Sequence, residues 1–235
     1  MKIITNYSPN FSKKIRKKKQ IKFVILHYTG MQSEIESIKR LTNQKTKVSC
    51  HYLINRKGLI IRMVKDKNIA WHAGKSKWKN FINLNKFSIG IELVNKGHQF
   101  GYQNYTNKQI NNLIVLCKKL KKKYKINTEN FLGHSDIAPL RKADPGEKFP
   151  WKKLSKFKLG KWYQQKNFIA VKNKKKKEKI FFKNIKKLGF RYFNIERRNS
   201  KDKKIIKSFQ QHYMPRNVNG KLDQKTFKIS QYLAN

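Results

Sequence analysis

The sequence predicts a mixed α/β fold, with helices flanking a central mixed β-sheet and a small three-helix unit after it. Three observations lead to this prediction. Short apolar runs alternate with segments of helical periodicity up to about residue 165, which is typical of a sheet with helices on its faces. A lysine-rich stretch then interrupts the pattern, and three short helical segments follow it. With 235 residues, the chain has room for one full domain and a small second one.

Five apolar segments are expected to form strands: residues 21–26, 48–54, 59–64, 88–94 and 130–132. The first is apolar throughout, which is typical of a strand covered on both faces. The second and third flank Asn55-Arg56-Lys57-Gly58, a turn sequence that predicts a hairpin. The segment around Trp71 and the residues after it are expected to form a loop.

Two helices are expected in the same part of the chain. Each begins at a capping-box pair, Ser33 with Glu36 and Thr106 with Gln109. Apolar residues recur at helical spacing behind both pairs. These residues are Ile35, Ile38 and Leu41 in the first helix and Ile110, Leu113, Ile114, Cys117, Leu120 and Tyr124 in the second.

The sequence divides into a main domain over residues 1–165, a basic linker over 166–179 and a three-helix domain over 180–235. The first of the three helices is expected to stop at Gly189, and Asp223 is expected to cap the last one. A unit of this size has only a marginal core. We therefore expect it to pack against the main domain.

The composition is strongly basic, with 58 Lys+Arg against 12 Asp+Glu and a formal net charge of +46. Hydrophobic residues make up 38% of the chain, which is enough for a packed core. A coding bias toward A and T accounts for part of the lysine excess. The remainder favours anionic partners: nucleic acid, acidic lipid surfaces or the carboxylate-rich bacterial wall. Only two cysteines occur, so no disulfide framework is expected.

The N-terminal residues contain no apolar core of signal-peptide length. No stretch approaches the roughly 20 apolar residues that a membrane-spanning helix needs. We therefore expect no transmembrane segment and a cytoplasmic protein, with a periplasmic or wall-associated location as the alternative. The sequence leaves the oligomeric state open.

The segment from Gly133 to Gly146 sets an imidazole, His134, ten residues before a carboxylate, Asp144. Far upstream, His27 follows the first apolar run. Two histidines and one carboxylate suit a zinc ion whose fourth position is open for water, which such an ion activates at neutral pH. A lone histidine on a strand is more often a core residue with satisfied hydrogen bonds, and the spacing alone leaves both interpretations open.

Glu92 is a carboxylate inside an expected strand. Alternation places Ser88 and Gly90 on the same face, where these small residues leave room for something to approach Glu92. A buried, unpaired carboxylate is unfavourable, so it needs a partner or a task. The two interpretations are an ion pair with a lysine and a general base.

Five motifs resemble those of the type-2 N-acetylmuramoyl-L-alanine amidases, which belong with the peptidoglycan-recognition proteins and phage lysozyme-amidases. They lie in the family's order at residues 23–31, 48–54, 70–74, 88–93 and 133–146. The resemblance implies a hydrolase that cuts the amide bond between the lactyl group of N-acetylmuramic acid and L-alanine of the stem peptide. Peptidoglycan or muropeptide fragments would be its substrate, in bacterial cell-wall degradation or peptidoglycan turnover, with Zn2+ as the cofactor.

The resemblance also implies roles for individual residues. His27, His134 and Asp144 match the zinc ligands, and Glu92 matches the catalytic glutamate. Lys142 matches the lysine that stabilises the tetrahedral intermediate. Trp71 and His72 match a substrate-groove motif, although a packed loop aromatic also explains Trp71.

Cys50 departs from the family pattern, since relatives in the recognition-protein and phage branches have a tyrosine there. The base role therefore falls to Glu92, and Cys50 is either a packed thiol or a thiolate near the metal. His51 is expected to pack or hydrogen bond within its hairpin. His98 and His212 are expected to be surface residues.

Residues 205–233 resemble the three-helix peptidoglycan-binding module of such amidases; a purely stabilising helical cap is the alternative. Two other functions compete with the amidase. A non-catalytic peptidoglycan-recognition protein would keep the fold without needing the complete catalytic set. A nucleic-acid-binding protein is suggested by charge alone, and no base-reading module is visible, so no specific nucleic acid is expected. The choice between intact wall and soluble anhydro-muropeptides stays open.

Overall fold

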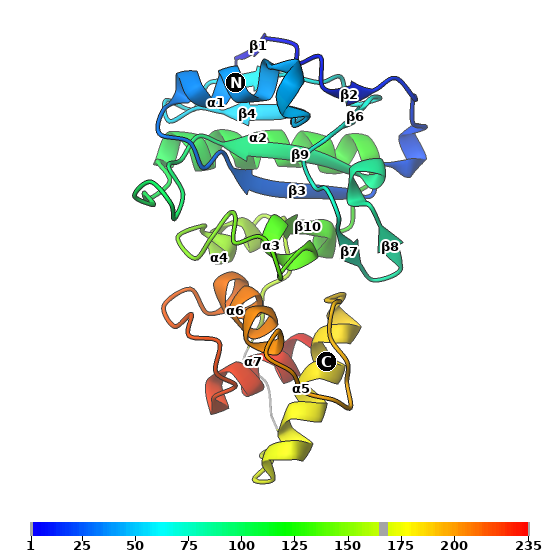
Figure 1. Ribbon diagram of the computed structural model, residues 1–235, viewed down its shortest axis with the longest axis vertical. Helices are drawn as coiled ribbons and strands as arrows, with labels where there is room; N and C mark the ends of the chain where they lie inside the picture. Colours follow the sequence, from blue (N-terminus) through cyan, green and yellow to red (C-terminus); the bar gives the residue numbers. More distant parts are fainter. Residues whose placement is uncertain (1, 165–168, 235) are drawn as a thin grey trace.

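The computed structural model describes residues 2–164 and 169–234 (Figure 1). Its centre is a six-stranded mixed sheet. In spatial order the strands are β1 (Ile3–Thr5), β5 (Ile60–Arg62), β4 (Tyr52–Ile54), β9 (Ser88–Leu93), β3 (Phe23–Tyr28) and β10 (Phe131–Gly133). The β4–β5 hairpin is antiparallel and the other pairs are parallel. The predicted mixed α/β fold is confirmed.

The short strands were the least predictable elements. β1 pairs with β5 at the sheet edge, although no strand was expected there. The expected loop after Trp71 contains a two-stranded ribbon of β7 (Lys77–Trp78) and β8 (Phe81–Ile82). A second ribbon pairs β2 (Phe11–Ser12) with β6 (Ile69–Ala70). Strands of two or three residues contain too little alternation to stand out in a sequence.

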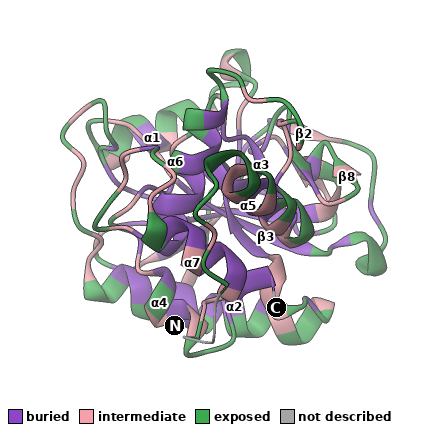
Figure 2. Cartoon of the chain, turned by 90° about the horizontal axis from the view of Figure 1, so that it is seen from below, coloured by how far each residue is buried: buried purple, intermediate pink, exposed green. Residues whose placement is uncertain are grey.

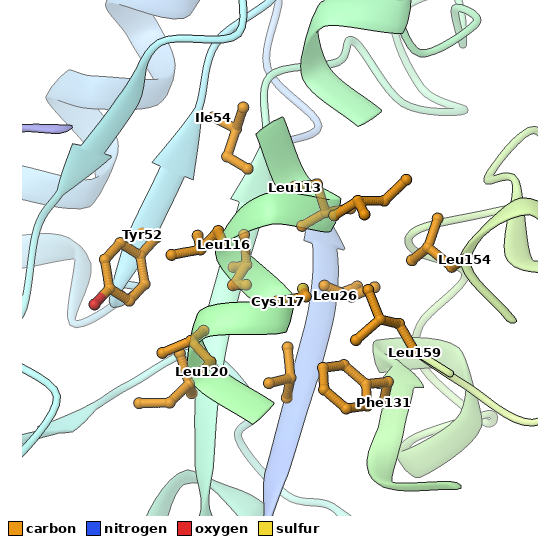
Figure 3. Close-up of a cluster of buried hydrophobic side chains, with 14 of the residues drawn as sticks. Leu26, Tyr52, Ile54, Leu113, Leu116, Cys117, Leu120, Phe131, Leu154 and Leu159 are labelled. Carbon is orange, nitrogen blue, oxygen red and sulfur yellow. The ribbon is translucent and has the colours of Figure 1, made fainter. Parts of the chain in front are cut away.

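Helix α2 (Asn107–Tyr124) covers one face of the sheet, and Thr106 and Gln109 form the expected capping box. Figure 3 shows Leu113, Cys117 and Leu120 of this helix facing side chains of the sheet, and all three are buried. Burying each large apolar side chain contributes about 1.5–3 kcal/mol. The predicted apolar stripe therefore docks the helix on the sheet.

Helix α1 (Glu34–Thr42) also begins where expected, and the Ser33 side chain accepts a hydrogen bond from the Glu36 amide. The reciprocal half of the capping box is missing, because the Glu36 carboxylate accepts from the amide of Gln32 instead, at 3.2 Å. Ile35 is 66% exposed and therefore does not join the core, whereas Leu41 is buried.

The C-terminal helices are α5 (Lys174–Leu188), α6 (Asp202–Tyr213) and α7 (Gln224–Ala234). They lie below β10 and α3 (His134–Ile137) (Figure 1). Seen from that side, α6 and α7 are largely buried, whereas α5 shows much exposed surface (Figure 2). α5 begins inside the range 166–179 expected as a linker, of which residues 166–168 lie outside the described part.

One hydrophobic cluster joins the C-terminal helices to the sheet. It includes Phe23 and Ile25 of β3 together with Phe181, Phe209 and Phe227 of the three helices. The expected packing of the small unit against the main domain is therefore confirmed. Gly189 ends α5 and Asp223 caps α7 by accepting from the amide of Thr226 at 2.7 Å, as predicted.

His212 is buried, so its expected position at the surface was wrong. α6 turns this side chain toward α3, where Nδ1 donates to Asp136 Oδ2 over 2.8 Å. The imidazole also stacks on Trp151 of α4 (Trp151–Ser155), with ring centroids 4.0 Å apart. Within the described residues, no helix has the length and hydropathy that crossing a bilayer requires.

Candidate metal centre and active site

Two neighbouring strands deliver the first two site residues. His27 of β3 and Glu92 of β9 are direct partners in a parallel pair. Parallel strands end at the same edge of a sheet, so both side chains reach that edge together. β10 pairs with β3 on the other side and runs directly into α3, whose first residue is His134.

Three ligand atoms converge at this edge. The Nδ1 atoms of His27 and His134 lie 3.0 Å apart. Asp144 Oδ2 lies 2.9 Å from the first of them and 3.0 Å from the second. All three residues are buried. A tetrahedral zinc site with bonds of about 2.1 Å separates its ligand atoms by roughly 3.4 Å, so this donor set fits such an ion after a small expansion.

The electrostatics favour the ionisation states that bind a cation. Burial, and then the charge of His134, lower the pKa of His27 to about 4, so its imidazole is neutral at pH 7. Burial alone would raise the pKa of Asp144. The neighbouring His134 and His27 outweigh that effect and hold the pKa of the carboxyl below its usual range. The group therefore presents a neutral His27 imidazole and an ionised Asp144 carboxylate.

The loop after β6 supports both imidazoles from behind. His134 Nε2 lies 3.1 Å from the carbonyl oxygen of Ala73, which also accepts from Arg141. His27 Nε2 lies 3.0 Å from Nδ1 of His72. Hydrogen bonds from the outer nitrogen of a ligating histidine orient the ring and set its tautomer.

Both residues of the substrate-groove motif line the cavity, but their contacts differ. Trp71 is half-buried and borders the cavity in front of the three ligand atoms. His72 is buried and engages both ring nitrogens, one with His27 and the other with Ser88 Oγ at 3.2 Å. Both ring nitrogens of His72 are therefore engaged within the protein, and its substrate-binding role stays a prediction.

Glu92 lies in the same cavity without a partner. Among the described residues, its Oε2 atom has neither solvent contact nor a hydrogen bond, and no ion pair forms there. Burial, and then the charge of Asp144, raise the pKa of Glu92 well above its usual range, against the opposing effect of Lys142 and Arg40. The structural ion pair considered for this carboxylate is absent from the described part of the chain.

The cavity has a volume of about 640 Å³ and a basic rim. Lys142 is exposed on this rim, and the amide of its own backbone donates to the Ala138 carbonyl at 3.1 Å. Arg40, Lys96 and Arg141 also line the cavity. Two imidazoles, two carboxylates and a lysine around one cavity are the parts that metal-assisted hydrolysis requires.

Cys50 is fully buried, and burial raises the pKa of its thiol well above the usual range. Its Sγ contacts Met63 Sδ at 3.8 Å, and it is not among the clustered ligand atoms. The packed-thiol interpretation agrees with these contacts.

The two remaining histidines make contacts beyond those expected. His51 is buried, but its Nδ1 accepts from the amide of Gly90 on β9, outside its own hairpin. His98 is partly exposed as expected, yet it lies at the cavity rim between Tyr28 and Glu147. Sequence reasoning missed this rim cluster, because its members come from three separate loops and strands.

Comparison with known proteins assigns the family. The family described as N-acetylmuramoyl-L-alanine amidase matches residues 17–147, a range that contains every site residue above. The chain belongs to this family.

Relatives include the N-acetylmuramoyl-L-alanine amidase AmiD of Escherichia coli (strain K12), which is 34% identical over 231 residues, covering 91% of this chain and 82% of AmiD. The 1,6-anhydro-N-acetylmuramyl-L-alanine amidase AmpD of the same organism is 41% identical over 105 residues, or 45% of this chain and 55% of AmpD. The latter match thus spans less than half of this chain.

Two solved structures resemble the whole fold. The complex of AmiD with anhydro-N-acetylmuramic acid-L-Ala-D-gamma-Glu-L-Lys has a TM-score of 0.79 and 30% identity, covering 91% of this chain and 88% of that one. AmpDh3 from Pseudomonas aeruginosa, in complex with anhydromuramic pentapeptide, has a TM-score of 0.79 and 29% identity, covering 96% and 95%. Both likenesses extend beyond the amidase domain into the C-terminal helices.

Proposed function

We propose that this chain is a zinc-dependent amidase that hydrolyses the bond between the lactyl group of N-acetylmuramic acid and L-alanine of the stem peptide. One observation carries the proposal: the ligand atoms of His27, His134 and Asp144 meet within 3.0 Å, in the cavity that holds the unpaired Glu92. Zinc held by these atoms would polarise the scissile carbonyl and lower the pKa of a water molecule to about 7.

The protein's own side chains would move the protons. Glu92 accepts a proton from the attacking water and returns it to the amine of the departing L-alanine. Its raised pKa suits both steps, because the carboxyl must hold the proton between them. Lys142, which lines the same cavity, would stabilise the developing oxyanion through its ammonium group.

The substrate class follows from the charge of the cavity and from the ligands of the relatives. Stem peptides carry free carboxylates, and the rim residues Arg40, Lys96 and Arg141 are cationic. The solved AmiD and AmpDh3 complexes contain soluble anhydro-muropeptides. We infer that such fragments are substrates here, which fits a role in peptidoglycan recycling.

Binding to polymeric wall is the proposed contribution of the C-terminal unit, residues 180–235. A groove of about 600 Å³ adjoins the active-site cavity and shares Arg141 and Lys142 with it. Lys204 and Lys207 of α6 line its other side. A glycan strand with several stem peptides would then be held by both units at once.

Incubation with purified peptidoglycan and with soluble anhydro-muropeptides tests the proposal. The expected product is free stem peptide, identified by mass spectrometry, with zinc present and not after chelation. Binding of either substrate without peptide release would instead identify a non-catalytic recognition protein. His134→Ala is the matched control, because it removes one ligand atom and should abolish release.

A further inference from the structure

The contacts of His72 are explained neither by substrate binding nor by packing alone. Its Nδ1 lies 3.0 Å from Nε2 of His27, and the two rings meet edge to face with centroids 5.1 Å apart. Its Nε2 lies 3.2 Å from Ser88 Oγ. The Ser88 hydroxyl in turn donates to the Leu84 carbonyl at 2.6 Å. These contacts form a chain from a main-chain carbonyl to a predicted metal ligand.

The direction of the hydrogen bonds in this chain is determined. The Ser88 hydroxyl has one hydrogen, which goes to Leu84, so its oxygen must accept from His72 Nε2. A neutral imidazole carries one N–H, and no carboxylate contacts the His72 ring among the described residues. Nδ1 of His72 is therefore an acceptor, and the group facing it is His27 Nε2.

His27 needs such an acceptor in order to bind a metal. Its Nδ1 can offer a lone pair only when the ring hydrogen is on Nε2. A buried N–H without an acceptor is unfavourable, because it loses its hydrogen bond to water. His72 Nδ1 is the hydrogen-bonding atom that the structure places there.

Strand β9 leaves space for the His72 ring. A Cβ atom at Gly90 would lie 2.3 Å from Cγ of His72, so only glycine leaves space for the imidazole on β9. The loop itself is held by Asn85, whose Oδ1 accepts from the amides of His72 and Ala73 at 3.1 and 2.7 Å. Ala73 is also the residue whose carbonyl faces His134 Nε2. The segment of His72 and Ala73 thus supports both His27 and His134.

We propose that His72 is a positioning residue for the metal centre: it holds His27 in the tautomer that binds the ion, with Ser88 and Gly90 fixing its own orientation. The inference rests on the proposed zinc function. It assigns His72 to the back of the metal site, and leaves substrate contacts in this motif to Trp71.

The test compares the zinc dissociation constant of the full chain and two variants by competition with a chelator. His72→Leu removes the acceptor, and we expect zinc binding to weaken by about 10- to 100-fold. His72→Asn keeps a carbonyl oxygen near the position of Nδ1, and we expect it to restore most of that affinity. If His72 had only a structural role, zinc affinity would not depend on whether the substituted side chain carries an acceptor. Equal zinc affinity of wild type and a folded His72→Leu would overturn the proposal.

Ser88→Ala provides a second test if His72→Leu does not fold. It leaves the imidazole in its glycine-lined space but removes the group that sets its tautomer. We expect zinc affinity to fall several-fold, and an unchanged value in the folded variant would overturn the proposal. The controls separate two failures: wild-type protein that binds no zinc contradicts the proposed function, whereas wild-type affinity in the variants contradicts only the role of His72.

Discussion

At the scale of single residues, the candidate site combines three converging ligand atoms with one carboxylate that has no partner among the described residues. Glu92 lies beside His27 in the sheet register, yet its Oε2 is unpaired in the described part of the chain. Proteins rarely bury such a group without a function for it. The proton-transfer role proposed for Glu92 is consistent with this arrangement.

Glu92→Gln should separate proton transfer from metal binding. The amide is close in size but cannot accept the proton of water, so we expect turnover to fall by at least about 10²-fold. Zinc content should be unchanged, since Glu92 is not among the three clustered ligands. Turnover on a soluble muropeptide and metal analysis of the same sample check both points. A near-normal rate would assign the base role elsewhere.

Cys50→Ala tests whether the thiol contributes to the metal centre. Its sulfur packs against Met63, away from the ligand cluster, so we expect zinc affinity to stay within about twofold of wild type. Some thermal stability should be lost, because the smaller side chain leaves a cavity in the core. A large loss of zinc affinity in the folded variant would show that the thiol does reach the ion.

At the scale of elements, the turn that carries His134 is held by the packing of α6 against α3. Asp136 Oδ2 accepts from the amide of Gly133 at 2.7 Å and from His212 at 2.8 Å. Ser208 of α6 donates to the Ser135 carbonyl at 2.8 Å. These contacts flank His134 on both sides. The C-terminal unit therefore braces the turn that carries a predicted zinc ligand.

His212→Ala should weaken this brace. It removes the stacking on Trp151 and leaves a buried carboxylate with one donor fewer, so we expect a loss of about 2–4 kcal/mol in the free energy of unfolding. Denaturant titration measures this loss. Lys207→Ala on the exposed side of α6 is the matched control, expected within about 0.5 kcal/mol of wild type. Equal stability of the two variants would contradict the bracing role.

The long elements could be predicted from sequence because their periodicity is strong, as in α2 and β3. His212 could not be placed, since both faces of α6 carry apolar and polar residues and only the docked partner shows which face is buried. The ligand triad was visible through its family motif. The role proposed for His72 could not be predicted from sequence, because it depends on a loop that folds over β9. Gly90 and Ser88 indicated only that some group approaches the strand there.

At the scale of the whole molecule, part of the basic charge that makes up the net +46 lies around the site. Basic residues rim both the active-site cavity and the adjoining groove, which is lined by the two units together. Many other lysines face solvent and match the compositional bias. The charge near the site would attract carboxylate-bearing substrates and would weaken with salt, since the Debye length falls from about 10 Å at 0.1 M to about 3 Å at 1 M.

Reversing the charge of the groove tests the contribution of α6 to polymer binding. We expect Lys204→Glu combined with Lys207→Glu to weaken co-sedimentation with insoluble peptidoglycan several-fold, because both side chains line the groove. Turnover of a soluble muropeptide should change much less, since neither lysine lines the active-site cavity. Unchanged sedimentation would place polymer binding on another surface.

The central claim is that two imidazoles and one carboxylate hold a catalytic zinc ion, and paired metal analysis and activity measurement test it most directly. We expect about one zinc per chain in the wild-type protein, loss of zinc and turnover together on chelation, and recovery of both when zinc is returned. His134→Ala should recover neither. Full amidase activity in protein shown to be free of metal would contradict the account.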